Sequence, residues 1–217
     1  EGNANVDWYD AIYRDKAGSQ EHNLSVQGGG ETVSYYFSAN YLDQNGLMEF
    51  NQDKFKRYTT TAKIRANITD WLDFNYTSRF IREDYGRPSN LSDGLFTDLA
   101  RQGWPILPLY DPNGFLYSSP SPALGLRDGG RDEKQDDSHY QQAQIVVQPM
   151  DGWEIFGEFN YRIKNNFRHW DIQQTYNHDI NGEPYLYNRG SHVYEYAFRE
   201  NYFNTNIYST YNFDINE

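Results

Sequence analysis

The stretch from Phe55 to Ile81 alternates between apolar and polar side chains with a period of two, and this pattern restricts the fold more than any other feature. Successive side chains of a β-strand point to opposite sides of the sheet, so the pattern predicts strands with one apolar and one polar face. Thr69, Asp70 and Trp71 interrupt it, which predicts two antiparallel strands joined by a tight turn. Each strand has about a dozen residues, whereas strands of soluble domains have about five or six. A tilted strand of about nine to eleven residues crosses a hydrocarbon core, so this length fits a membrane.

The alternation recurs along the chain and predicts an all-β fold, an antiparallel up-and-down meander of about seven strands. The predicted divisions are a loop segment at residues 1–20, strands at 21–83, a long loop at 84–137, strands at 138–164, a loop at 165–191 and a strand at 192–217. Trp8 to Tyr13 have the spacing of one short amphipathic helix or of a packed loop, and Asn181-Gly182 predicts a hairpin within the last loop. Short turns alternate strictly with long loops. All short turns should therefore lie at one end of the strands, as in outer-membrane β-barrels.

Composition excludes several classes of protein. Aromatic residues make up 18% and hydrophobic residues only 37% of the chain, with a mean hydropathy of -0.93. Disordered chains are poor in aromatic residues, so these values favour an ordered, alternating structure. No run of about 18 apolar residues exists, which excludes a transmembrane helix but not a barrel. The net charge of -12 argues against a nucleic-acid partner, and the absence of cysteine removes disulfides and thiolate metal sites.

The parity of each strand assigns side chains to the two faces. The residues expected to face lipid are Ile64, Ile68, Phe74, Tyr76, Ile155, Phe159 and Tyr161. The residues expected to face the lumen are Arg57, Lys63, Arg65, Arg79, Glu158, Arg162 and Lys164. The second set would line a transport path, contact a plug, or simply hydrate a polar interior. Aromatic residues near both ends of the strands predict two aromatic girdles. These residues are Trp71 and Trp153 at the short turns, and Tyr41, Phe55 and Tyr58 near the opposite ends.

The loops contain the remaining candidates for binding. The long loop contains four aromatic residues, Trp104, Tyr110, Phe115 and Tyr117. They would contact a substrate by stacking on sugar rings or by gripping a peptide. Alternatively, they would pack the loop's own core. The carboxylates Asp128, Asp132, Glu133, Asp136 and Asp137 could bind calcium, but they match no EF-hand spacing and a solvated loop is the simpler interpretation. His139, His169, His178 and His192 lack zinc-ligand spacing. Asp70 and Asp151 occupy turns and form no catalytic pair. From the spacing of the carboxylates and histidines together, neither a metal nor a cofactor is expected.

Several motifs resemble the barrel of SusC/RagA-like TonB-dependent transporters of Bacteroidetes. The segments that carry this resemblance are residues 7–14 (DWYDAIYR), 22–29 (HNLSVQGG), 35–38 (YYFS), 41–46 (YLDQNG), 55–58 (FKRY), 69–72 (TDWL) and 108–114 (PLYDPNG). They occur in order over about the first half of the chain, whereas the second half is similar only in architecture. Members of that family have a plug inside a barrel of about 22 strands. The chain should then be an internal piece of such a barrel, without the plug or the TonB-contacting segment.

The resemblance implies an importer in the outer membrane of a Gram-negative, Bacteroidetes-like bacterium, and not an enzyme. Its expected substrate is an oligosaccharide or a peptide, captured with a SusD-like surface lipoprotein. TonB-ExbB-ExbD would supply energy through the plug, outer-membrane lipid would surround the barrel, and two transporter–lipoprotein pairs would form a dimer. The alternatives are a soluble carbohydrate-binding β-sandwich, which the strand length and sorted loops disfavour, and a glycoside hydrolase, for which no carboxylate pair can be nominated.

Overall fold

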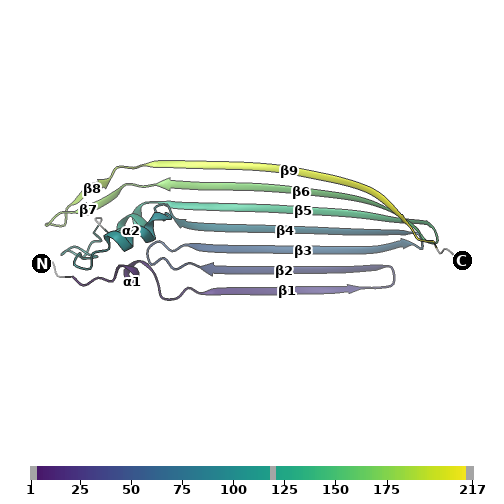
Figure 1. Ribbon diagram of the computed structural model, residues 1–217, viewed down its shortest axis with the longest axis horizontal. Coiled ribbons are helices and arrows are strands. Elements are labelled where there is room, and N and C mark those ends of the chain that lie inside the picture. Colours follow the sequence, from purple (N-terminus) through teal and green to yellow (C-terminus); the bar gives the residue numbers. More distant parts are fainter. Residues whose placement is uncertain (1–3, 118–120, 214–217) are drawn as a thin grey trace.

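The structure is a computed structural model that describes residues 4–117 and 121–213. It contains a single-layered, seven-stranded antiparallel sheet with the order β1-β2-β3-β4-β5-β6-β9 (Figure 1). The strands are β1 (Ser19–Gly29), β2 (Val33–Asn45), β3 (Lys54–Thr69), β4 (Leu72–Pro88), β5 (Arg131–Met150), β6 (Trp153–Ile172) and β9 (His192–Tyr211). Each strand pairs with the next along the chain except for β6 and β9, between which a two-stranded hairpin is inserted. The predicted meander is confirmed.

The connections separate into two kinds, and Figure 1 shows them at opposite ends of the strands. The three tight turns lie at one end, and the helices and long loops lie at the other. The turns are also staggered along the sheet. The β1–β2 turn closes at Ser34, which faces Arg65, whereas the β3–β4 turn closes further along β3 at Thr69. A sheet whose strands tilt around a barrel axis requires a stagger of this kind.

The long connections fold into a cap over the loop end of the sheet, called here the loop cap (residues 4–18, 46–53, 89–117, 121–130 and 173–191). It contains α1 (Trp8–Ile12), α2 (Gly94–Gln102), α3 (Ala123–Asp128) and the hairpin of β7 (Thr175–His178) and β8 (Pro184–Asn188). The short helix and the hairpin predicted from the sequence are therefore confirmed. The Asp7 carboxylate begins α1 by accepting from the Tyr9 amide at 2.9 Å. None of the described helices is long and apolar enough to cross a membrane.

The hydrophobic core of the described chain lies in the loop cap and not in the sheet. Its buried members are Trp8, Ile12, Met48, Leu95, Leu99, Leu116, Ala123, Leu124 and Leu126. By contrast, large apolar side chains in the middle of the sheet stay open to the surroundings, and Ile64 is 44% exposed and Phe159 46% exposed. A β-sandwich would bury such residues between two sheets. The β-sandwich alternative is therefore not favoured.

Three strands extend further toward the cap than the sequence alternation indicates. β4 runs to Pro88, β5 begins at Arg131 and β6 runs to Ile172, so the loop boundaries predicted at residues 84–137 and 165–191 are wrong at these ends. The reason is that both sides of the sheet are polar there, which removes the period-two signal. Cross-strand ion pairs such as Arg82–Asp137, at 2.7 Å, hold these extensions together instead.

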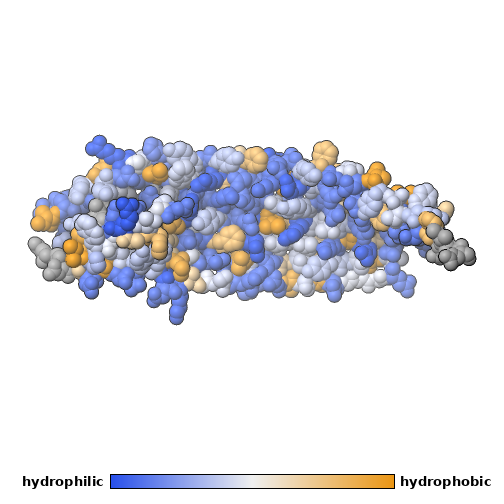
Figure 2. Space-filling model, in the orientation of Figure 1, coloured by the Kyte–Doolittle hydropathy of each residue, from blue (hydrophilic) through white to orange (hydrophobic). Residues whose placement is uncertain are grey.

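The register defines two faces, because side chains directly opposite one another in neighbouring strands lie on the same side. Ile64, Tyr76 and Phe159 share one side, called here the apolar face. Arg65 and Glu158 share the other side, called here the polar face. Figure 2 shows one side of the sheet, which is mostly hydrophilic with hydrophobic residues scattered singly over it.

Candidate functional site: the polar face and the loop cap

The residues predicted for the two environments separate onto the two faces. Arg57, Lys63, Arg65, Arg79, Glu158, Arg162 and Lys164 all lie on the polar face. Phe74, Tyr76, Ile155, Phe159 and Tyr161 lie with Ile64 on the apolar face. Ile68 falls in the β-bulge between Asn67 and Thr69 and is 58% exposed. The register thus gives the sheet two chemically distinct sides.

A ladder of hydrogen bonds crosses the polar face from β3 to β9. Arg65 Nε donates to Asn75 Oδ1 at 3.1 Å, and Asn75 Nδ2 donates to Gln144 Oε1 at 3.0 Å. Gln144 Nε2 donates to Glu158 Oε1 at 2.8 Å, and the same oxygen accepts from the Tyr208 hydroxyl at 3.1 Å. Bonds between side chains and a charged group are stronger than neutral ones. This ladder gives five strands a common, oriented polar surface suited to contact with water or a polar solute.

The apolar face forms a band that begins at the short turns. On β4 this band contains Leu72, Phe74, Tyr76 and Phe80, which span about 27 Å of strand at about 3.3 Å per residue. A tilt of about 40° reduces this to a height of about 20 Å, close to the apolar band of about 25 Å in outer-membrane barrels. Beyond the band, the rings of Tyr41 and Tyr58 contact each other with centroids 5.0 Å apart.

One member of the predicted aromatic girdles is misplaced. Tyr41 and Tyr58 face each other across β2 and β3 on the apolar face, whereas Phe55 lies on the polar face opposite Tyr85. The reason is the parity of β3, since odd positions such as Phe55 share the side of Arg57. Of the three residues predicted at this end, only Tyr41 and Tyr58 can therefore contribute to a girdle.

Asp132 anchors the polar face at the loop end and is only 5% exposed. The guanidinium of Arg168 donates to both its oxygens, at 2.7 and 2.8 Å, and Arg87 Nε donates to Oδ2 at 3.0 Å. Burial raises the pKa of Asp132, but the hydrogen bonds and positive charges of the two arginines outweigh burial, so the net pKa lies below its ordinary value. The Arg168 guanidinium also lies over the Trp170 ring, 5.5 Å from its centroid.

The acidic cluster predicted as a solvated loop is instead part of β5, apart from Asp128 in α3. Each carboxylate has a cationic neighbour: Asp128–Arg127, Asp132–Arg168, Glu133–Arg131, Asp136–Lys134 and Asp137–Arg82. Successive carboxylates along a strand point to opposite faces, which prevents them from surrounding one ion. Within the described residues no group of three acidic, histidine or cysteine side chains could hold a metal ion, and this includes the four histidines considered above.

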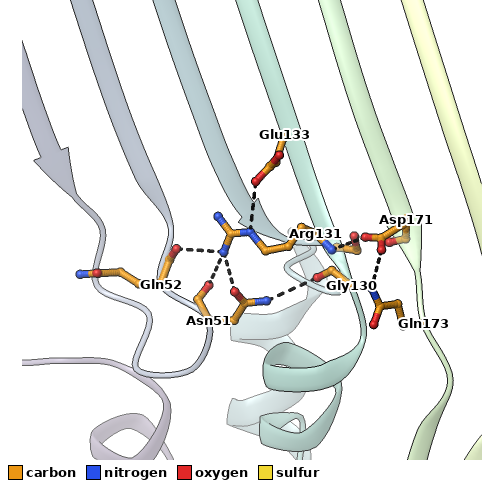
Figure 3. A network of polar contacts seen from close by, with 8 residues as sticks. Asn51, Gln52, Gly130, Arg131, Glu133, Asp171 and Gln173 are labelled. Atoms are coloured by element: carbon orange, nitrogen blue, oxygen red, sulfur yellow. Dashed lines mark hydrogen bonds and ion pairs between the residues drawn. The ribbon is translucent and has the colours of Figure 1, made fainter.

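Arg131 ties the loop cap to the sheet, as Figure 3 shows. Its Nη1 donates to the carbonyl oxygen and to Oδ1 of Asn51, at 3.1 and 2.6 Å, and to the Gln52 carbonyl at 3.2 Å. Its backbone amide donates to the Asp171 carboxylate at the end of β6. Gly130 precedes it with a φ of +106°, and a Cβ there would lie 2.4 Å from the Asp171 carbonyl oxygen. The loop between β2 and β3, the start of β5 and the end of β6 therefore meet in one polar junction.

The four aromatic residues proposed as substrate contacts lie on the surface of the loop cap. Trp104, Tyr110, Phe115 and Tyr117 are between 39% and 60% exposed. The alternative that they form the core of the loop is wrong, because leucines from α2, α3 and the loop fill that core. Phe115 stacks on His178 of β7 with centroids 3.6 Å apart, which joins the long loop to the inserted hairpin. Trp104 is 60% exposed, Tyr110 50% and Tyr117 40%.

A set of aromatic side chains on β9 was not predicted from the sequence. Phe203, Ile207 and Tyr211 lie on the apolar face. The opposite parity contains Tyr194, Tyr196, Phe198, Tyr202 and Tyr208. The signal was present in the sequence as five aromatic residues at even positions between 194 and 208, but it conflicted with the expectation of a polar inner face.

Comparison with known proteins places this architecture in context. No established family profile matches the sequence. The chain is 35% identical over 81 residues to the TonB-dependent receptor SusC of Bacteroides thetaiotaomicron, covering 37% of this chain and 8% of that protein. It is 33% identical over 69 residues to the TonB-dependent receptor P3 of Formosa agariphila, covering 32% of this chain and 7% of that protein.

Solved structures extend the likeness to almost the whole chain. The RagAB peptide importer in its closed-closed state superposes with a TM-score of 0.78 at 19% identity, over 99% of this chain and 24% of the solved chain. Its open-open state gives a TM-score of 0.75, also at 19% identity, over 97% of this chain and 24% of the solved chain. At this identity the likeness concerns the fold.

The sheet, its sorted connections and its two faces resemble a segment of the wall of the RagAB barrel. With the sequence matches to SusC and P3, this segment is similar to part of a SusC/RagA-like TonB-dependent transporter. The resemblance stated from the motifs is thus supported by both comparisons. The chain spans less than a tenth of the curated relatives and about a quarter of the solved chains that it matches.

Proposed function

We propose that this chain forms part of the wall of an outer-membrane importer that takes up oligosaccharides or peptides in a Gram-negative, Bacteroidetes-like bacterium. The observation that carries the proposal is the single-layered sheet, whose apolar side chains stay exposed while the buried core found among the described residues lies in the loop cap. In water such a continuous exposed apolar side would promote association. Facing lipid, it is stabilised, and the polar face then borders a water-filled lumen.

The names of the relatives support the protein partners that we include in this proposal. SusC and P3 are named TonB-dependent receptors, and RagAB is named a peptide importer. On this basis we place a plug inside the complete barrel, energy supply by TonB-ExbB-ExbD, and a SusD-like lipoprotein over the loop cap, with two such pairs forming a dimer. No bond is made or broken in this scheme, so the chain is not an enzyme. Trp104, Tyr110, Phe115 and Tyr117 would meet the substrate at the mouth.

Cysteine labelling tests the orientation directly, because this chain contains no cysteine. In the complete transporter, Ile180→Cys places a thiol at the 90% exposed tip of the β7–β8 hairpin, and Asp151→Cys places one in a short turn. A membrane-impermeant maleimide should label the first variant in intact cells and the second only after the outer membrane is permeabilised. Labelling of both in intact cells would contradict the transmembrane arrangement.

Uptake tests the activity. Cells that express the complete transporter should accumulate fluorescent oligosaccharides or peptides, and an uncoupler of the proton gradient should abolish accumulation while surface binding persists. Accumulation that survives the uncoupler would exclude an energised importer and leave a passive pore. Equal accumulation in cells that lack the gene would exclude any role in uptake.

A further inference from the structure

Seven aromatic side chains follow the polar face of β6 and β9 from the loop end to the turn end. This aromatic track consists of Phe156, Trp170, Tyr194, Tyr196, Phe198, Tyr202 and Tyr208. Its five members on β9 are between 44% and 55% exposed. Tyr194 and Tyr208 are about 46 Å apart along the strand at about 3.3 Å per residue, and rings on successive positions of this face are about 6.6 Å apart.

Neighbouring side chains hold several of these rings in position. Trp170 and Tyr194 stack with centroids 4.7 Å apart and an interplanar angle of 24°, and Phe156 and Tyr208 stack at 4.8 Å and 11°. The Arg162 guanidinium lies 5.6 Å from the centroid of Tyr202. Rings fixed in this way lose little conformational entropy when a ligand stacks on them.

Exposed aromatic rings on the polar face require an explanation that lipid does not provide. The apolar face already has its own side chains for lipid, and the track lies on the opposite side with Arg65 and Glu158. A polar lumen needs no aromatic side chains for hydration. Exposed apolar groups gathered on one surface generally mark a place where something binds.

The chemistry beside the rings indicates a neutral, amphipathic ligand. Two ion pairs lie beside the track, Arg162–Glu200 and Arg168–Asp132. Glu158 and Lys164 add one further charge of each sign on the same face, so the track has no strong preference for either an anion or a cation. Between Tyr202 and Tyr208, the amides of Asn204 and Asn206 occupy the same face and offer both donors and acceptors. Flat ring faces alternating with amides match a sugar ring, which has an apolar C–H face and a rim of hydroxyl groups.

We propose that the aromatic track is a stacking path for a neutral oligosaccharide. The inference rests on the proposed import function and narrows its substrate class from oligosaccharide or peptide to the former. A chain of sugar rings would stack near Trp170 and Tyr194 at the mouth and move from ring to ring toward Tyr208. The repeated spacing provides successive stacking positions of similar chemistry, so that no single position holds the chain strongly.

The test uses the complete transporter with two probe sets, neutral hexasaccharides with α and β linkages and neutral hexapeptides. The variant Tyr196→Ala/Phe198→Ala/Tyr202→Ala removes three rings, and Phe203→Ala removes a ring from the apolar face of the same strand as a matched control. We expect hexasaccharide uptake at subsaturating concentration to fall about tenfold or more in the triple variant and to change less than twofold in the control. Surface expression and heat-induced mobility shifts in gels confirm that each variant is folded.

A conservative variant separates stacking from packing. Tyr196→Trp/Phe198→Trp/Tyr202→Trp keeps the three ring faces and should retain hexasaccharide uptake within about threefold, whereas Tyr196→Leu/Phe198→Leu/Tyr202→Leu keeps bulk and should lower it about tenfold, as the alanine variant does. Uptake of hexasaccharides that is unchanged in the triple variant would overturn the track while leaving the importer intact. Uptake of hexapeptides alone by the unmodified transporter would overturn the substrate class. Uptake of neither probe set, with or without an energised membrane, would overturn the proposed function itself.

Discussion

Replacing Asp132 with asparagine should release the loop end of the sheet. The side chain of Asp132 is 7% exposed and accepts three hydrogen bonds from two guanidinium groups, one each on β4 and β6. Asp132→Asn preserves the shape but removes the charge, so Arg87 and Arg168 remain as two neighbouring cations without their common counter-ion. The amide can accept at one oxygen only and would direct an N–H group toward a guanidinium.

The expected magnitude follows from burial. Breaking a buried ion pair by removing one partner costs about 3–5 kcal/mol. The side chains of Arg168 and Arg87 are 41% and 33% exposed, so water compensates part of their loss. We therefore expect a local cost of about 2–3 kcal/mol, which corresponds to an opening constant about 30 to 150 times larger.

Amide hydrogen exchange of the complete transporter in phospholipid vesicles measures this opening directly. Protection in residues 131–137 and 165–172 should fall by the stated factor, while the band between Leu72 and Phe80 stays unchanged. Asp128→Asn is the matched control, since Asp128 pairs with Arg127 at 2.6 Å with side chains 40% and 49% exposed, and exposed pairs contribute about 0–1 kcal/mol. A change below about threefold in Asp132→Asn would refute the anchoring role.

Three further perturbations test other parts of the structure. Ile64→Lys places a charge in the middle of the apolar face and should cost about 2–4 kcal/mol in guanidinium unfolding from vesicles, whereas Gln142→Lys on the polar face should cost less than about 1 kcal/mol; equal costs would contradict the sidedness. Gly46→Ala would place a Cβ 1.8 Å from Asp53 Oδ2, so protease cleavage within residues 46–53 should increase while the sheet remains intact, and an unchanged cleavage rate would show that the loop accommodates the methyl group. Because the pKa of Asp132 is lowered in the folded state, its stabilising contribution is complete above the ordinary value of about 3.9 and is lost as pH falls below it. Exchange protection of residues 131–137, corrected for the intrinsic rate, should therefore be constant from pH 7 to about pH 5 and decrease below about pH 4 in the unmodified protein. Asp132→Asn should not show this decrease. A decrease that begins near pH 6 would implicate another group.

The strands and their faces could be predicted because the underlying constraint is local. A period of two follows from strand geometry alone, and Tyr58 to Ile68 express it without help from distant residues. The loop-end extensions could not be predicted in this way. At Asp136 and Asp137 both sides of β5 are polar, and only the cross-strand partners Asn166 and Arg82 reveal that the segment is a strand.

The helices α2 and α3 of the loop cap could not be predicted, for a different reason. α2 places Leu95 and Leu99 four residues apart, which is a helical signal, but the prolines and turn motifs around it favoured an irregular loop. The core that these helices form with Trp8 and Met48 depends on segments distant in sequence. Periodicity within one segment does not reveal such contacts.

The length of the strands connects the two halves of the proposed mechanism. β5, β6 and β9 each have 20 residues, about twice the nine to eleven residues that a tilted strand needs to cross the hydrocarbon. In the proposed arrangement their loop-end halves would have no lipid to stabilise the apolar face, and ion pairs such as Arg82–Asp137 lie on that face instead. The wall would then continue above the membrane and raise the loop cap on a rim. Trp170 and Tyr194 lie on this rim, so a ligand would stack on fixed rings before it reaches the membrane-spanning part of the lumen.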